Sequence, residues 1–385
     1  MRPVRVLPVG DPAVFLAELR LALSATEEAL LPVPAAEAQA PAGRDRLGPV
    51  PRSVAVVIET SGSTGVPKRV MLSTDALLAS SAASSVALGG EGQWLLALPA
   101  HYIAGVQVLV RSIAAGTEPV VLPPGHFDPA VFAEYAGRLD HPLRFTSLVP
   151  VQLARLLDAA AADAGILAVL TRFTGILVGG QAVSAELVDR ADRAGIRLLC
   201  TYGSSETAGG CVYNGVPIGN TVVRAVDGQL EISGAVLAEG YLDDADRTLD
   251  RFVEEAGVRW YRTGDLGSVA ADGTVLVSGR ADNVIISGGE KVSLDAVETL
   301  VRGLPGYSEA VVVRGADPDW GQVPVVVLAA GGPAATTPDL TGLRAAVAAA
   351  LGNPARPARI VLVPVIPVLP SGKPDRQGLE GVVAR

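Results

Sequence analysis

Short apolar runs alternate with helical patterns over residues 53–203, and this alternation is the most regular feature of the chain. The runs are rich in Val, Ile and Leu, and the segments between them repeat apolar positions at helical spacing. Strands that are apolar on both faces and separated by helices predict an α/β layer with a largely parallel sheet. The expected strands are residues 53–60, 94–99, 118–123, 144–150, 174–180 and 196–203.

The pattern changes after about residue 210. Two Asp-Gly pairs, at 227–228 and 272–273, each lie between β-rich runs, which is a strong signal for β-hairpins. We therefore expect a small antiparallel β subdomain over about 210–281. The predicted fold class is α/β, with a large N-terminal domain (1–281) of mixed, largely parallel sheets and helices. A small α+β domain (282–385) follows it.

Composition narrows the class of protein. The chain has 385 residues, 49% hydrophobic and 18% charged, so it can bury the cores of two or three domains. Its net charge of -9 argues against nucleic acid or an anionic membrane as the main partner. No apolar run reaches the roughly 18 residues of a membrane span, and two cysteines cannot form a disulfide framework. We expect a cytoplasmic protein, and three histidines without metal-ligand spacing argue against zinc.

Lysine is rare and stands in glycine-rich loops. Only three of the 31 basic residues are lysines, at positions 68, 291 and 373. Lys is a compact charge on a flexible stem and Arg is a planar fork, so the two are not interchangeable where a single oxygen must be contacted. Each lysine therefore marks a candidate functional loop.

The first of these loops, TSGSTGVPK at residues 60–68, follows an apolar strand. Its glycines permit tight turns, its hydroxyls and backbone N–H groups suit an anion, and Lys68 adds positive charge. It is not a Walker A motif, because no glycine precedes Lys68 and Arg69 follows it. We predict a phosphate-binding loop, with an ordinary surface turn as the alternative.

Three carboxylates and a basic residue stand in later loops. Glu206, in TYGSSETAGG, lies at the carboxyl end of a strand and suits Mg²⁺, with a solvated loop glutamate as the alternative. Asp265, in YRTGDLG, suits two ribose hydroxyls or a plain turn. In GRADNVIISGGEKVS, Arg280 suits phosphate or ribose and Asp282 suits a hinge, with a simple linker as the alternative.

Together these segments resemble the adenylate-forming superfamily of acyl-CoA synthetases, peptide-synthetase adenylation domains and luciferases. TSGSTGVPK, YGSSE, YRTGDLG, GRADN and SGKPD occur in that family's order and approximate spacing over residues 60–375. The resemblance implies that residues 282–385 form a mobile lid hinged at Asp282. It also implies ATP, Mg²⁺ and coenzyme A as cofactors or co-substrates.

The resemblance also assigns roles to single residues. The residues implied to be catalytic are Lys373, Glu206 and Lys68, with Glu206 as the Mg²⁺ ligand. Lys373 is implied to reach the carboxylate and the α-phosphate during adenylation and to withdraw when the lid rotates. The residues implied to bind ATP are Thr60, Ser61, Gly62, Ser63, Thr64, Gly65, Lys68, Gly179, Gly180, Gln181, Thr201, Tyr202, Gly203, Ser205, Asp265 and Arg280.

The coenzyme A site is implied by the same resemblance. Rotation of the lid would bring Gly288, Gly289 and Lys291 to the site for attack by the CoA thiol. An exposed lysine at the start of a helix is an equally good interpretation of Lys291.

The acid would be bound by LPAHYIAGVQVLVRS (98–112), which matches the acyl-pocket helix of the family. No aspartate stands there to pair with an ammonium, so an amino acid substrate is disfavoured. The candidate substrate residues are His101, Tyr102, Gly105 and Arg111. Many relatives carry His where Tyr102 stands, which leaves the roles of His101 and Tyr102 open. Arg111 suits a second substrate carboxylate, or is an ordinary arginine near a helix end.

The compact, Arg- and Ala-rich chain, with LPAH and VGGQAVS, looks most like actinobacterial o-succinylbenzoate–CoA ligases of menaquinone (vitamin K2) biosynthesis. That resemblance implies an AMP-forming acid–CoA ligase acting on an aromatic dicarboxylate. The alternatives are another aryl- or acyl-CoA ligase, transfer to a carrier protein, and a nucleotide-binding regulator without catalysis. The expected partners are a small carboxylic acid, ATP and CoA, and a homodimer stays open.

Overall fold

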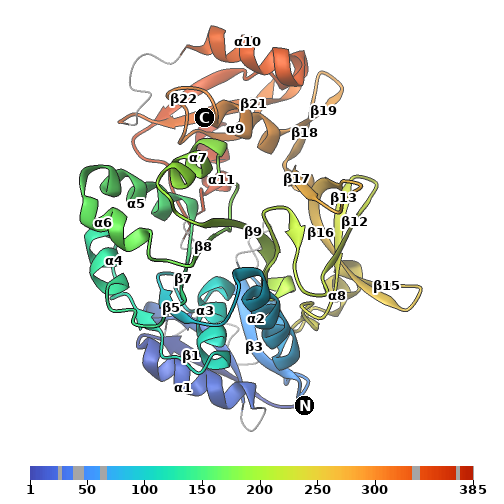
Figure 1. Ribbon diagram of the computed structural model, residues 1–385. Coiled ribbons are helices and arrows are strands. Elements are labelled where there is room, and N and C mark those ends of the chain that lie inside the picture. The colour runs from blue at the N-terminus through green and yellow to red at the C-terminus, as the bar shows by residue number, and fades with distance from the viewer. Residues whose placement is uncertain (25–27, 38–46, 61–66, 332–338, 370–372, 385) are drawn as a thin grey trace.

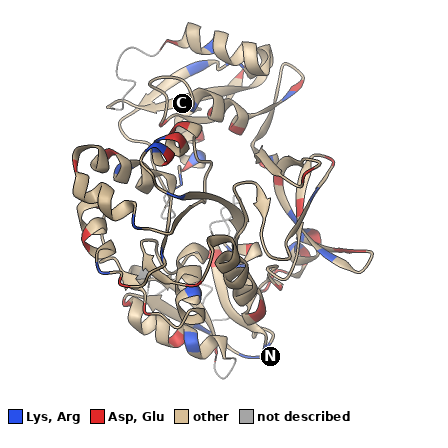
Figure 2. Cartoon of the chain, viewed as in Figure 1, with Lys and Arg blue, Asp and Glu red and all other residues tan. Residues whose placement is uncertain are grey.

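The computed structural model of the chain contains four β-sheets with helices packed on them. It describes residues 1–24, 28–37, 47–60, 67–331, 339–369 and 373–384. Figure 1 shows the fourth sheet and its helices as a smaller unit at the top, with the C-terminus in it and the N-terminus at the opposite end. Basic and acidic residues are interspersed along the visible ribbon (Figure 2).

The first sheet has the strand order β1-β2-β3-β4-β14, parallel from β1 to β3 and antiparallel thereafter. Its N-terminal part was not predicted from the sequence, because prolines interrupt it. Pro8 lies in the edge strand β1, where a missing N–H is tolerated. Asp11 caps α1 (Pro12–Leu23) by accepting from Ala13 N. The strands are β1 (Val4–Val9), β2 (Ala29–Pro34), β3 (Val54–Thr60), β4 (Lys68–Ser73) and β14 (Gly240–Tyr241).

The second sheet has the order β11-β10-β9-β8-β7-β5-β6. The pairs from β9 to β6 are all parallel, which confirms the predicted α/β layer for the expected strands from 94–99 to 196–203. The expected strand 53–60 is instead β3 of the first sheet and pairs antiparallel with β4. The strands are β5 (Gln93–Leu96), β6 (Val120–Val121), β7 (Arg144–Leu148), β8 (Gly175–Val178), β9 (Leu198–Ser204), β10 (Gly209–Tyr213) and β11 (Val216–Pro217).

Helices cover both faces of this second sheet. On one face, a single apolar core joins α1, α2 (Thr74–Leu88) and α3 (Ile103–Ala114) to the first two sheets. A second core lies on the other face, under α4 (Pro129–Ala136), α5 (Pro150–Ala162), α6 (Ala164–Leu170) and α7 (Ala185–Arg193). Ser184 caps α7 as predicted, by accepting from Leu187 N. The second sheet thus lies between two packed helical layers. Ligands of such sheets bind at the carboxyl ends of the parallel strands.

The third sheet is antiparallel, with the order β12-β13-β16-β15 and β17 paired to β16. Both predicted hairpins are confirmed. Asp227 (φ 49°) and Gly228 (φ 78°) occupy the two left-handed positions that a tight hairpin turn requires. The sheet begins at Val222, because 210–217 extend the second sheet instead. The elements are β12 (Val222–Val226), β13 (Gln229–Ser233), α8 (Ala245–Arg251), β15 (Phe252–Glu255), β16 (Val258–Val269) and β17 (Val275–Arg280).

The fourth sheet contains β19-β18-β21-β20, with β22 parallel to β21. The predicted α+β pattern and the α/β fold class are confirmed, while the boundary at 281/282 stays a prediction. Within the described ranges, no helix is long and apolar enough to cross a membrane. The elements are β18 (Val284–Ser287), β19 (Glu290–Ser293), α9 (Leu294–Arg302), β20 (Val311–Asp317), β21 (Gly321–Ala329), α10 (Leu340–Leu351), β22 (Arg359–Val363) and α11 (Arg376–Val383).

Candidate active site

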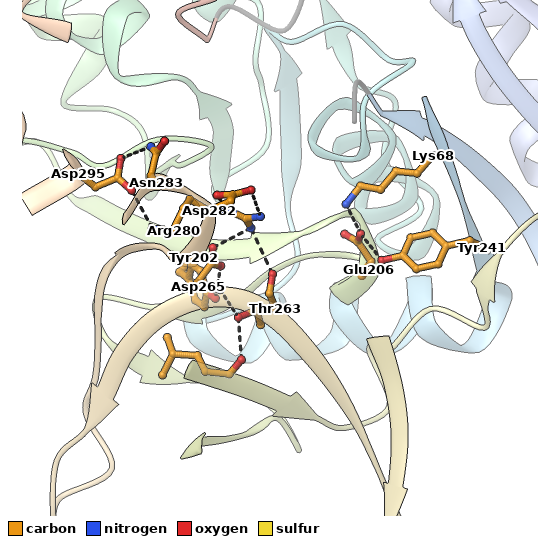
Figure 3. A network of polar contacts seen from close by, with 11 residues as sticks. Lys68, Tyr202, Glu206, Tyr241, Thr263, Asp265, Arg280, Asp282, Asn283 and Asp295 are labelled. Carbon is orange, nitrogen blue, oxygen red and sulfur yellow. Dashed lines mark hydrogen bonds and ion pairs between the residues drawn. The ribbon is translucent and has the colours of Figure 1, made fainter. Parts of the chain in front are cut away.

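Glu206 is a buried, ionised carboxylate at the end of β9. It lies in a single 3₁₀ turn, Ser205–Thr207, and is 1% exposed. Its Oε1 accepts from Lys68 Nζ (2.5 Å) and from the Tyr241 hydroxyl (2.8 Å), as Figure 3 shows. Burial alone would raise the pKa of Glu206, but Lys68 and Tyr241 outweigh it and hold that pKa below its usual value. The alternative of a solvated loop glutamate is therefore wrong.

Asp265 lies within the long strand β16, so the plain-turn alternative is also wrong. Its Oδ2 accepts from the Tyr202 hydroxyl (2.6 Å), and its Oδ1 accepts from Arg280 Nη1 (3.0 Å; Figure 3). Arg280 stands opposite Asp265 in the β16–β17 register. Burial and the Asp265 charge both raise the pKa of Tyr202, which keeps the phenol a hydrogen-bond donor.

The segment between β17 and β18 is held by an ion pair and by hydrogen bonds on both sides. Arg280 donates to both carboxylate oxygens of Asp282, at 3.2 and 3.1 Å. Asp295, on α9, accepts from Arg280 N (2.7 Å) and from Asn283 Nδ2 (2.8 Å). Arg314, on β20, donates to Asp282 O (2.9 Å). The predicted hinge residue is thus held by residues that precede it and by residues of the fourth-sheet unit.

Lys373 stands on a short paired segment just before α11. Leu369 N donates to Lys373 O (2.8 Å), and Asp375 N donates to Pro367 O (2.8 Å). The Lys373 residue is exposed, yet desolvation lowers its pKa, and the charges of nearby groups also act on it. Of those groups Arg280 and Lys68 lower the pKa, while Asp265 and Glu206 raise it. The structure therefore places Lys373 within electrostatic reach of the Glu206 and Asp265 groups.

Arg111 is a buried guanidinium on α3. It is 5% exposed, donates to Ser84 Oγ (3.0 Å) and the Tyr213 hydroxyl (3.4 Å), and lies over the Trp94 ring. Its Nε has no partner, and none of the described carboxylates pairs with it. Desolvation lowers the pKa of Arg111. Burying an unpaired charge is costly, which favours a ligand anion over a structural role at this position.

His101, Tyr102 and Gly105 lie at the start of α3. The His101 and Tyr102 rings are in contact, with centroids 4.2 Å apart, and both residues are half-buried. At Gly105 a Cβ would stand 2.3 Å from Pro99 O, so glycine is needed for the close approach of two backbone segments. Gly105 therefore shapes α3 through packing.

Gly105→Ala is expected to lower the thermal unfolding midpoint, because the added methyl must displace the backbone at Pro99. Overpacking of this kind costs about 1–3 kcal/mol. Gly381→Ala, in α11 with no atom near the added methyl, is the matched control and should leave the midpoint unchanged or raise it. Equal midpoints for the wild type and Gly105→Ala in a calorimetric scan would contradict this account.

Comparison with known proteins decides the family. The family model "AMP-binding enzyme" matches residues 16–242, and the model "AMP-binding enzyme C-terminal domain" matches residues 296–373. The chain belongs to the AMP-binding enzyme family. The matched ranges contain Lys68, Glu206 and Lys373, so the predicted adenylate-forming resemblance is confirmed at the level of the family.

Individual relatives are similar over most of the chain. A Mycobacterium tuberculosis protein named probable 2-succinylbenzoate–CoA ligase is 38% identical, with 98% of this chain and 97% of the relative covered. The 2-succinylbenzoate–CoA ligase of Salmonella typhimurium is 32% identical over 72% of this chain and 58% of its own length. A structure of an Escherichia coli MenE variant with bound OSB-AMS superposes with a TM-score of 0.75 at 25% identity, covering 100% of this chain and 88% of that chain.

The phosphate-loop prediction falls mostly outside the described residues. Thr60 and Lys68 pair in register where β3 and β4 meet, so the loop joins two adjacent antiparallel strands. Ser61, Gly62, Ser63, Thr64 and Gly65 lie outside the described ranges. Their role in binding the phosphates of ATP stays a prediction for this member of the family.

A group of the residues implied to bind ATP lies at the ends of β8 and β9. A Cβ on Gly179 would stand 2.3 Å from Thr201 Oγ1, so these two segments touch. Gly203 is equally tight against Gly209 O, at 2.1 Å. Ser205 is buried beside Glu206. Gly180 follows Gly179 with φ 81°, and Gln181 is half-buried. Binding of ATP by this cluster stays a prediction.

The coenzyme A candidates form a hairpin of the fourth sheet. Gly288 and Gly289 make the β18–β19 turn with φ 56° and 85°, and Lys291 is exposed on β19. The Trp320 ring lies where a Cβ on Gly288 would be, 2.6 Å from its nearest atom, so the turn requires glycine. Lys291 lies in a strand, so it is not at a helix start, and its role toward CoA stays a prediction.

The residues present fit a Mg²⁺ ion that arrives with ATP. Among the described residues, no group of three or more His, Cys, Asp or Glu could hold a metal by itself. Mg²⁺ commonly takes one or two protein carboxylates and completes its shell with phosphate oxygens and water. One ionised, buried carboxylate at Glu206 matches that requirement.

Several residues of the site were missed from the sequence. Tyr241, Asp295 and Trp320 each contact a predicted residue: Glu206, the Arg280 backbone and Gly288 respectively. Each comes from a segment distant in sequence, and no local motif marked it. The Gly-Tyr step in the apolar segment before α8 was the one signal available for Tyr241.

Proposed function

We propose that the chain is an ATP-dependent, AMP-forming acid–CoA ligase that converts 2-succinylbenzoate to its CoA thioester, a step of menaquinone biosynthesis. The observation that carries the choice of acid is Arg111, a buried guanidinium without a carboxylate partner among the described residues. A dicarboxylic acid leaves one carboxylate for Arg111 while the other reacts. The 38% identity to a named ligase of this acid along almost the whole chain supports the same substrate.

In the first half-reaction we expect a substrate carboxylate oxygen to attack the α-phosphorus of ATP, as the bond to pyrophosphate breaks. Asp265 would accept from the ribose hydroxyls, and Lys68 would contact phosphate. Lys373 would contact the attacking carboxylate and the α-phosphate, where its charge stabilises negative charge that builds up in the transition state. Mg²⁺ held by Glu206 would supply further neutralisation of the phosphates.

In the second half-reaction the CoA sulfur would attack the adenylate carbonyl, and AMP would leave with the electrons of the broken C–O bond. We expect this half-reaction to proceed without Lys373 at the reacting carbonyl. Rotation about Asp282 would withdraw Lys373 and bring the β18–β19 hairpin to the site. The contacts of Asp295 and Arg314 around Asp282 support a defined starting position for that rotation.

The test is pyrophosphate release from Mg·ATP with a panel of acids, with and without CoA. The panel contains 2-succinylbenzoate, benzoate, octanoate and mixed amino acids. We expect strong release with 2-succinylbenzoate alone and a thioester only when CoA is added. Release with a different acid would keep the ligase chemistry and assign another aryl- or acyl-CoA ligase. Failure of free CoA as acceptor would indicate a carrier protein instead.

Location and assembly complete the proposal. Cys200 and Cys211 are free thiols, which fits a reducing compartment, and we propose the cytoplasm. A homodimer stays a prediction that light scattering of the purified protein can test.

A further inference from the structure

We propose that Tyr241 is the positioning residue of the Glu206 carboxylate: its hydroxyl fixes Oε1 so that the carboxylate is presented to the Mg²⁺ that accompanies ATP. The inference rests on the proposed function, because it concerns the same nucleotide site. Tyr241 was not among the predicted site residues, and its segment matches none of the motifs that marked the others.

The Glu206 carboxylate is held by two donors that meet at one oxygen. Lys68 Nζ and the Tyr241 hydroxyl both contact Oε1, at 2.5 and 2.8 Å (Figure 3). The proposed function requires the Lys68 ammonium for phosphate. When Lys68 turns toward phosphate, the Tyr241 hydroxyl is the donor that still holds Oε1, which keeps the buried carboxylate from rotating freely.

The backbone around Tyr241 is built to fix this contact. Ala238 N donates to Glu206 O (2.8 Å), so a backbone hydrogen bond anchors the segment that carries Tyr241 to Glu206. Tyr241 then pairs with Val70 in β4, the strand that begins with Lys68. The two donors therefore approach Glu206 from paired, adjacent strands.

Side-chain packing restricts Tyr241 further. Its ring contacts Phe252, with centroids 5.8 Å apart, and Phe252 contacts Tyr261 at 5.1 Å. Thr248 Oγ1 accepts from Tyr241 N (2.9 Å) and lies against Gly240, where a Cβ would be 2.5 Å from the Thr248 methyl. A neutral phenol in this place can hold an anion without replacing the cation that the carboxylate binds.

The experiment compares nucleotide binding by the full-length wild type and Tyr241→Phe, using calorimetric titration with ATP at saturating Mg²⁺ and with ATP in EDTA. A hydrogen bond to a charged group corresponds to about a 10-fold or larger change in affinity. We expect Tyr241→Phe to weaken binding of Mg·ATP by about that factor and to leave metal-free ATP binding within about twofold.

Tyr135→Phe, in α4 beside Arg138, is the matched control and should bind both forms like the wild type. Unchanged Mg·ATP binding by Tyr241→Phe overturns the inference. Equal weakening with and without Mg²⁺ also overturns it, because a general disturbance of the fold would act on both. If the wild type binds neither form, the proposed function itself fails and the inference with it, so the two failures are distinguishable.

Discussion

Lys373→Ala is expected to lower the rate of adenylate formation by about 100- to 1,000-fold, the range found when one preorganised donor to a transition-state charge is removed. Lys373 stands within electrostatic reach of Glu206, Asp265 and Lys68, where the α-phosphate of ATP would lie. The second half-reaction, from a preformed adenylate and CoA, should proceed at the wild-type rate within a few-fold. Pyrophosphate release measures the first step, and thioester formation from added adenylate measures the second.

The exposed lysine of the β18–β19 hairpin supplies the opposite control. Lys291→Ala should spare pyrophosphate release, and if the CoA prediction holds it should slow thioester formation. Lys373→Arg keeps the positive charge but changes its geometry. It should not restore adenylate formation, because a planar guanidinium does not replace a compact ammonium at a single oxygen. An equal loss of rate in both half-reactions of Lys373→Ala would contradict the assignment of Lys373 to adenylation alone.

Arg111→Met is expected to raise KM for 2-succinylbenzoate by about 30-fold or more, because a buried substrate carboxylate would lose the charged partner proposed for it. Met keeps an unbranched apolar side chain at this position and removes the guanidinium that lies over the Trp94 ring. KM for ATP should stay within about twofold, since Arg111 is on α3 and not at the Glu206 or Asp265 groups. Steady-state kinetics over both substrates make the comparison.

A monocarboxylic acid separates this role from a structural one. Turnover of benzoate, if any, should be unchanged or improved in Arg111→Met. Ser84 and Tyr213 would lose a donor, so the melting temperature must be recorded beside the kinetics. If 2-succinylbenzoate use is unaffected, Arg111 is a structural residue and does not carry the choice of acid.

Much of the fold follows from local pattern. The parallel strands from β9 to β6 and the two Asp-Gly hairpins were predictable because burial on both faces and left-handed turn residues leave direct marks on the sequence. The strand–helix–strand unit at the N-terminus was not, because Pro8 in β1 is tolerated only at a sheet edge, and edge position is a tertiary property.

The residues of the site also fall into two groups, those that a local motif marks and those that it does not. Glu206, Asp265 and Arg280 stand in short motifs with characteristic residue types, so the sequence marks them. Tyr241 and Asp295 act on those residues from elements that pairing brings close, β14 against β4 and α9 beside β17. A contact between distant segments has no local signature, and a single sequence cannot predict it.

The scarcity of lysine has a practical consequence for anyone studying the enzyme in solution. The three primary amines on side chains stand on β4, on the β18–β19 hairpin and before α11, in three different parts of the proposed cycle. The extent of labelling at each lysine by an amine-selective reagent, read by mass spectrometry, would therefore report on three parts of the proposed cycle with almost no background. It would follow the position of the proposed lid without any engineered probe.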